Sequence, residues 1–234
     1  MEISVISTII LVSAIQSIFG VGVLLFGTPL LLIMEYSFIE ALILLLPLSI
    51  LINLFQIRGN IYNIDKSVYF KVLIYSVPLI IVFLYIISTR DIDVTGIIGV
   101  FLIIIAFKSK IVNQLLSFDK LYFLIMGIIH GLTNLGGALL TAKVFYLDLN
   151  KHQKRTTIAI SYLTFAIFQL LTLIFLDKIS NNYLLLVEYT GLGLMTYFIV
   201  NRFIFSTLSN KDYEIYFSIF LIASGILLIL KGVK

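Results

Sequence analysis

The sequence predicts an all-α protein that crosses a membrane several times, and three observations lead to this prediction. First, 61% of the 234 residues are hydrophobic and only 12% are charged, whereas soluble domains average roughly 25% charged residues. Second, the mean hydropathy is +1.14, and long apolar runs alternate with short polar segments. Third, a glycine-rich stretch occurs twice, which predicts two homologous halves. One soluble core could not bury so much apolar surface.

The first glycine-rich stretch, residues 16–29, lies inside an apolar run that covers residues 3–34. As one helix, a run of about 32 residues would be roughly 48 Å long, whereas the hydrocarbon core of a bilayer is about 30 Å thick. Glycine and proline both disfavour a continuous helix, so we expect a break here. Lipid cannot pair the backbone groups that a break exposes, so this backbone must pack in protein or line a wet cavity.

A second stretch, residues 130–143, matches the first at a shift of about 114 residues, and broken helices at matching places in two halves are typical of transporter binding sites. The aligned pairs are Gln16 with His130, Gly20 with Asn134, Gly22 with Gly136, and Pro29 with Lys143. The alternative is that the glycines only allow helices to pack closely.

The two halves are predicted to be residues 1–114 and 115–234, which together form one integral membrane domain. In each half, a broken helix precedes three spanning helices. The expected spans are residues 41–57, 67–88 and 94–107 in the first half, and residues 156–176, 183–200 and 213–230 in the second. A kink is expected at Pro78.

Two topologies fit this order of segments. If both broken segments cross the bilayer, the chain has eight full spans and parallel repeats, and its basic residues divide almost evenly between the two sides. If both are re-entrant, the repeats are inverted, and roughly three quarters of the 16 Lys and Arg residues lie on one side, as expected for cytoplasmic loops. We therefore favour inverted repeats in the cell inner (plasma) membrane, with both termini outside.

Several functional classes have no support in the sequence. Cysteine is absent, so there is no disulfide or thiolate site. Nucleotide-binding, metalloprotease and serine-hydrolase motifs are missing, and the two histidines, His130 and His152, lack metal-ligand spacing. We therefore predict a protein that is not an enzyme and has no cofactor and no metal. The net charge of +4 does not indicate a nucleic-acid partner. The N-terminus has no basic region, so we interpret it as the first membrane segment rather than a signal peptide.

The candidate substrate-binding residues lie at and beside the two breaks. Helix N-termini favour negative charge, so backbone amides at a break can bind an anion, and polar side chains nearby can add donors. The candidates are Gln16, Gly20, Gly22 and Thr28 at the first break, and His130, Thr133, Asn134, Gly136, Gly137 and Thr141 at the second.

Two of the polar residues at the second break have alternative interpretations. His130 shares a helix face with Thr133 and Asn134, so it could be a substrate donor, a proton carrier, or a histidine held by a backbone carbonyl. Lys143 could offer charge to an anion, or its head group could reach the cytoplasmic interface.

Other polar residues in the apolar segments have structural interpretations as well. Threonines such as Thr28 and Thr141 commonly bond their own helix. We expect the amides of Asn53 and Gln169 to tie helices together, although they could also line a pathway. Glu188 is a functional candidate only if it lies deep in the membrane.

The first break, Gly20-Val-Gly22-Val-Leu-Leu-Phe-Gly-Thr-Pro29, resembles the G-I-G-G-G-x-x-x-x-P break of the TauE/SafE family of sulfite exporters and related permeases. The repeated break, the polar loop at residues 58–65, and the glycine-bearing helices near Gly191 and Gly225 are similar as well. The sequence departs from the family pattern at Val23, Leu24, Asn134 and Lys143. The resemblance implies transport of small sulfur-containing anions.

These observations predict a secondary permease for a small anion, and the resemblance implies sulfite, thiosulfate or an organosulfonate as that anion. No ATPase motif is present, so the driving force would be an ion gradient or the gradient of the substrate itself. The expected partners are the anion, the lipid bilayer, and a coupling proton or other ion. The alternatives are a non-transporting membrane assembly component and a carrier of a non-sulfur solute.

Overall fold

The computed structural model describes residues 2–19, 21–58, 60–90, 92–106, 118–179, 183–203 and 226. Within these ranges the chain forms helices and no strand. Four helices are long and apolar enough to cross a membrane: Phe38–Ile57, Lys66–Arg90, His152–Phe175 and Leu184–Phe203. Together with the shorter apolar helices, they confirm the prediction of an all-α polytopic membrane protein.

The predicted spans agree with these helices wherever the structure describes them. The four long spans at residues 41–57, 67–88, 156–176 and 183–200 each fall on one of the four long helices. The shorter predicted span at 94–107 corresponds to α6 (Thr95–Ala106), which has 12 residues. The last predicted span, residues 213–230, lies outside the described residues except for position 226.

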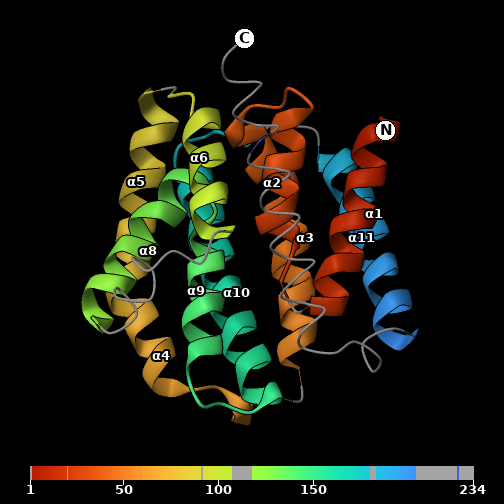
Figure 1. Ribbon diagram of the computed structural model, residues 1–234. Coiled ribbons are helices and arrows are strands. Elements are labelled where there is room, and N and C mark those ends of the chain that lie inside the picture. Colours follow the sequence, from red (N-terminus) through yellow and green to blue (C-terminus); the bar gives the residue numbers. More distant parts are fainter. Residues whose placement is uncertain are drawn as a thin grey trace. The chain divides into compact units, whose positions relative to one another are not determined.

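The first break forms a helical hairpin of α1 (Ile3–Phe19) and α2 (Val23–Ile33) (Figure 1). At its open end, the Tyr36 hydroxyl donates a hydrogen bond to the Glu2 carboxylate at 2.8 Å. The Thr8 hydroxyl also contacts the sulfur of Met34 at 3.6 Å. The chain therefore returns, after α2, to the place where α1 began.

Proline does not mark this break, contrary to the sequence interpretation. Pro29 is buried inside α2, which continues to Ile33. Neighbouring protein groups can satisfy the carbonyl that proline leaves free, so prolines are tolerated inside membrane helices. The interruption instead falls between the end of α1 at Phe19 and the start of α2 at Val23, directly after Gly22.

The second break forms a hairpin of α8 (Asp119–Thr133) and α9 (Gly136–Tyr146). Asn134 ends α8 in the left-handed conformation, with φ of 62°. At the open end, Lys143 on α9 forms an ion pair with Asp119, the first residue of α8, at 2.6 Å. This hairpin therefore also returns to its starting point.

The described chain divides into two compact units. The first unit contains α1, α2, the part of α3 (Phe38–Ile57) up to Leu48, α6, and α11 (Tyr183–Phe203). Here α1 packs along α11 (Figure 1). The Ser17 hydroxyl donates to the Tyr197 carbonyl at 3.2 Å, which ties the end of α1 to α11.

The second unit contains the rest of α3, η1 (Ile61–Asn63), α4 (Lys66–Lys71), η2 (Val72–Ser76), α5 (Val77–Arg90), α8, α9, and α10 (Lys151–Phe175). The π-turn η2 stands directly before Pro78, where a kink was expected. Proline has no N–H to close the regular hydrogen bond, and a wider turn accommodates this loss. The helix α8 crosses at this turn, where the Ser76 hydroxyl donates to the Phe123 carbonyl at 2.7 Å.

The same order of elements occurs twice along the chain. A hairpin, a long helix and a second long helix appear as α1–α2, α3 and α4–α5, and again as α8–α9, α10 and α11. Each compact unit packs the hairpin of one predicted half against the second long helix of the other, because α1 packs on α11 and α8 packs on α5. The division into residues 1–114 and 115–234 remains a prediction.

Candidate functional site

At the first break, Gln16 caps the helix that follows. The backbone N–H of Val23 donates to Gln16 Oε1 at 2.9 Å, so the first amide of α2 already has an acceptor. A Cβ added at Gly22 would lie 2.9 Å from the backbone nitrogen of Gln16. Glycine at this position therefore allows α1 and α2 to meet. Thr28 is fully buried on α2, and Gly20 lies outside the described residues.

At the second break, His130 occupies the place that corresponds to Gln16. A Cβ added at Gly136 would lie 2.5 Å from the Cβ of His130 and 2.5 Å from the carbonyl oxygen of Met126. Both hairpins thus have a glycine at the start of the second helix, packed against a buried polar residue of the first. The close contact at each glycine also fits the alternative that these residues serve packing.

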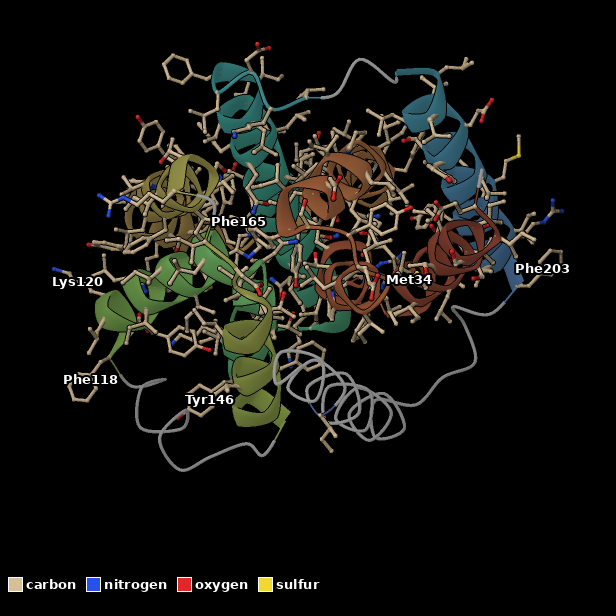
Figure 2. The ribbon with its side chains drawn as sticks, turned by 90° about the horizontal axis from the view of Figure 1, so that it is seen from above. Met34, Phe118, Lys120, Tyr146, Phe165 and Phe203 are labelled. Atoms are coloured by element: carbon tan, nitrogen blue, oxygen red, sulfur yellow. The ribbon has the colours of Figure 1, made fainter. Side chains whose placement is uncertain are left out.

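Three side chains of α10 complete the surroundings of His130. The imidazole packs against Phe165, with ring centroids 4.5 Å apart, and lies edge-on to Tyr162 at 6.5 Å. Figure 2 labels Phe165 on α10. The hydroxyl of Tyr162 lies over Gly137, since a Cβ added there would overlap with it. Tyr162 and Phe165 were not predicted as site residues. Their spacing from Gln169 along α10 is the sequence signal that could have identified them, because it places all three near one helix face.

Gln169 connects α10 to the break. Its Nε2 donates to Asn134 Oδ1 at 3.2 Å, and both side chains are fully buried. The prediction that Gln169 ties helices together is therefore confirmed. Asn53 differs, because its amide donates to the Ser49 carbonyl one turn earlier in the same helix, at 2.8 Å. That bond lies within α3 and does not link two helices.

The threonine hydroxyls at the second break donate within their own helices. Thr141 donates to the Gly137 carbonyl at 2.9 Å, and Thr133 donates to the Ile129 carbonyl at 2.7 Å. The Thr133 oxygen also accepts from the N–H of Leu135 at 3.2 Å. Each hydroxyl has one proton, so these two residues can offer a substrate only acceptor capacity in this arrangement.

Three buried polar atoms at the second break lack a hydrogen bond to any described residue: His130 Nδ1, His130 Nε2 and Gln169 Oε1. Gln169 is near enough to interact with the imidazole, although the geometry is not that of a hydrogen bond. Leu135, the residue before α9, has no polar side chain to cap this helix, and its own N–H is bonded to the Thr133 oxygen. The first amides of a helix have no partner within that helix. This break therefore combines backbone donors with buried side-chain atoms that lack a hydrogen bond to the described residues.

Lys143 forms an ion pair at the open end of the second hairpin. Its side chain is only 5% exposed and pairs with Asp119 Oδ1 at 2.6 Å, while Lys71 pairs with Asp119 Oδ2 at 2.5 Å. These two lysines hold the pKa of the Asp119 carboxyl below its usual value. Lys143 therefore neutralises a carboxylate at the open end of the hairpin. Glu188 is exposed, which gives no support to a deep functional role.

The structure groups the predicted residues by hairpin. Gln16, Gly22 and Thr28 belong to the first unit, and the six candidates of the second break belong to the second unit. Among the described residues, no cluster of three or more His, Cys, Asp or Glu side chains could hold a metal ion. The chemistry that the second break offers is recognition of a small polar or anionic group by amides and neutral side chains.

Comparison with known proteins points to one family. A protein-family model described as "Sulfite exporter TauE/SafE" matches residues 5–228. This match covers nearly the whole chain and includes both hairpins. A search of the curated proteins and a search of the solved structures each found no match.

Proposed function

Because the chain belongs to the TauE/SafE family of sulfite exporters, we propose that it is a secondary permease for a small sulfur-containing anion, such as sulfite, thiosulfate or an organosulfonate. The family is one of membrane transporters, and membership implies transport of sulfite or a related anion. The multi-pass helical fold agrees with this class. We further propose which residues bind the substrate and how the protein transports it.

The observation that carries the proposal is a set of buried polar atoms at the second break that have no hydrogen bond to the described residues. Buried polar groups are almost always hydrogen-bonded, yet both nitrogens of His130 and one oxygen of Gln169 have no such bond within the described chain. They lie beside the start of α9, where Gly136 and Gly137 let His130 and Tyr162 approach the backbone closely. An anion that leaves water needs several donors, and helix N-termini supply them in transporters of this general design.

The arrangement in the membrane follows from the two hairpins. If each is re-entrant, the chain has inverted repeats and both termini lie outside the inner membrane. Roughly three quarters of the 16 Lys and Arg residues then lie on the cytoplasmic side, in accord with the positive-inside rule. The return of each hairpin to its own starting point, where Tyr36 bonds Glu2 and Lys143 pairs with Asp119, supports this arrangement.

Transport requires the second break to open, because His130, Asn134 and Gln169 are fully buried. Alternating access by movement of one repeat against the other would expose them in turn. The driving force would be the gradient of the anion or of a coupling ion. His130 is the candidate carrier if that ion is a proton.

Flux through reconstituted liposomes tests the proposal. We expect the wild-type protein to move labelled sulfite in a saturable way and His130→Leu to lose at least about nine tenths of this flux, because removal of a positioned donor commonly costs 10²-fold or more. His152→Leu is the matched control, since His152 is exposed near the start of α10. A folded wild-type protein that moves no sulfur anion would contradict the proposal.

Packing alone is the second candidate role, and the close contacts at Gly22, Gly136 and Gly137 favour it. A non-transporting assembly component would need those glycines to fold, but it would not need the imidazole to bind a solute. Equal function of His130→Leu and wild type in cells, with no flux in liposomes, would support this alternative.

A further inference from the structure

The two hairpins differ in how the second helix of each one begins. In the first hairpin, Gln16 Oε1 accepts a hydrogen bond from the first amide of α2. In the second hairpin, the aligned residue is His130, and the side-chain acceptor described before α9 is the Thr133 hydroxyl oxygen, which accepts from the N–H of Leu135 at 3.2 Å. A side-chain oxygen at a helix N-terminus takes the place that a bound anion would occupy. The first hairpin therefore has a side-chain acceptor on the first amide of its second helix, whereas the acceptor in the second hairpin bonds Leu135, one residue before α9 begins.

The side chains beside α9 give an independent indication of a ligand. His130 and Gln169 are both fully buried. Neither imidazole nitrogen is hydrogen-bonded to the described part of the chain, and neither is Gln169 Oε1. Burial of such groups without partners is unfavourable. A ligand that reached the start of α9 could bond these atoms.

The hydrogen-bonding capacity of these atoms restricts that ligand. A neutral imidazole has one N–H donor and one acceptor nitrogen, and an amide oxygen only accepts. Gln169 already uses its Nε2 to bond Asn134. Two acceptors thus stand beside one donor. Even if the His130 N–H turned to Gln169 Oε1, one acceptor nitrogen would remain, and a donor on the ligand could satisfy it.

We propose that the second hairpin selects a small oxyanion that carries its own hydrogen-bond donor, such as hydrogensulfite or a hydroxylated sulfonate, over anions that lack one. This inference rests on the proposed function and names the class of substrate. The negatively charged oxygens would bond the amides at Gly136 and Gly137, and the ligand hydroxyl would donate to Gln169 or His130. An anion without a donor would direct lone pairs at these acceptors, which weakens binding.

Two sulfonates that differ in a single hydroxyl group test this selectivity. The probes are ethanesulfonate and 2-hydroxyethanesulfonate, added to the detergent-purified full chain while its thermal unfolding is followed. A ligand that binds the native state raises the unfolding temperature by mass action. A site built to bond a hydroxyl discriminates strongly against an analogue that lacks it. We expect 2-hydroxyethanesulfonate to reach half-maximal stabilisation at about tenfold lower concentration.

A variant tests the assignment to this site. Gln169→Met removes the acceptor oxygen at similar volume, and we expect the preference between the two sulfonates to disappear. Asn53→Met is the control, because it removes another buried amide, one that bonds Ser49 within its own helix. We expect this control to keep the preference. If Gln169→Met does not fold, the comparison of the two sulfonates on the wild-type protein still decides the proposal.

The outcomes separate this inference from the proposed function. Equal stabilisation of the wild type by both sulfonates would overturn the donor requirement and leave anion transport intact. A preference that survives in Gln169→Met would overturn the assignment to the second hairpin. If neither sulfonate stabilises the wild type and hydrogensulfite does not either, both the inference and the anion-permease proposal fail.

Discussion

At the scale of single residues, Asn134 determines how the second hairpin turns. It is one of three non-glycine residues with positive φ in the described chain, and it aligns with Gly20 of the first hairpin. The left-handed conformation costs most residues roughly 1–2 kcal/mol, but asparagine tolerates it better than most. Its side chain also accepts the hydrogen bond from Gln169. Asn134 therefore combines a backbone role with a contact at the candidate site.

These two roles can be separated by substitution. Asn134→Gly keeps the left-handed turn and loses the side-chain bond to Gln169, whereas Asn134→Leu loses this bond and also strains the backbone. We expect the leucine variant to be less stable than the glycine variant by about 1–2 kcal/mol, measured by thermal or denaturant unfolding in detergent. If both variants are equally stable, the turn is not under the conformational constraint that φ of 62° implies.

The residues of the candidate site were predictable to different degrees. The glycines could be found from the sequence because they form a cluster that recurs at a constant shift within two apolar runs. The cap from Gln16 to Val23 could not, because it depends on the angle at which α1 and α2 meet. Tyr162 was missed for a similar reason: its hydroxyl reaches Gly137 only through the rotation of α10 against the hairpin. Periodicity places residues on a face but does not tell which element that face contacts.

At the scale of elements, the ion pairs at the open end of the second hairpin hold its two helices and α4 together. Asp119 on α8 accepts from Lys143 on α9 and from Lys71 on α4. Hydrogen bonds from Lys143 and then Lys71 lower the pKa of the Asp119 carboxyl from 3.8. The folded protein therefore holds this carboxylate more strongly in its charged form than the unfolded chain does.

This pKa shift predicts a dependence of stability on pH. Because the folded-state pKa is depressed, the contribution of Asp119 is fully present above pH 3.8 and is lost as the pH falls through the lower folded-state value. We expect Asp119→Asn to lower the unfolding temperature at neutral pH, since it leaves buried Lys143 without its carboxylate. The difference from wild type should shrink in acid. A difference that stays constant down to the acid limit would contradict this assignment, and Asp148→Asn serves as the control.

At the scale of the whole molecule, the long helices among the described residues are those that the sequence predicted, and each compact unit combines helices of both predicted halves. The apolar runs predicted the long helices because a bilayer requires about 20 apolar residues per span. The pairing of α1 with α11 and of α8 with α5 joins residues distant in the chain. No local pattern records such a pairing, because these helices are apolar on most of their faces. Because helices that are apolar on most faces have no clear hydrophobic periodicity, the sequence of such a protein does not show which of its helices pack together.

The orientation of the chain in the membrane distinguishes re-entrant hairpins from full spans. The sequence has no cysteine, so single cysteines can be introduced without removing native thiols, at Tyr62, His152 and Lys178. If both hairpins are re-entrant, residues 62 and 152 share the cytoplasmic side and residue 178 lies outside. If both broken segments cross fully, residues 62 and 178 share one side and residue 152 lies on the other.

A membrane-impermeant thiol reagent applied to intact cells reads out these positions. Under the re-entrant arrangement, we expect labelling of Lys178→Cys alone, with Tyr62→Cys and His152→Cys labelled only after the membrane is opened. Tyr62 is 96% exposed within the described chain and His152 is also exposed, so a lack of labelling in intact cells would reflect the membrane and not burial. Labelling of Tyr62→Cys and Lys178→Cys from the same side would instead require eight full spans. The positive-inside distribution and the inverted relation of the two hairpins would then both be wrong.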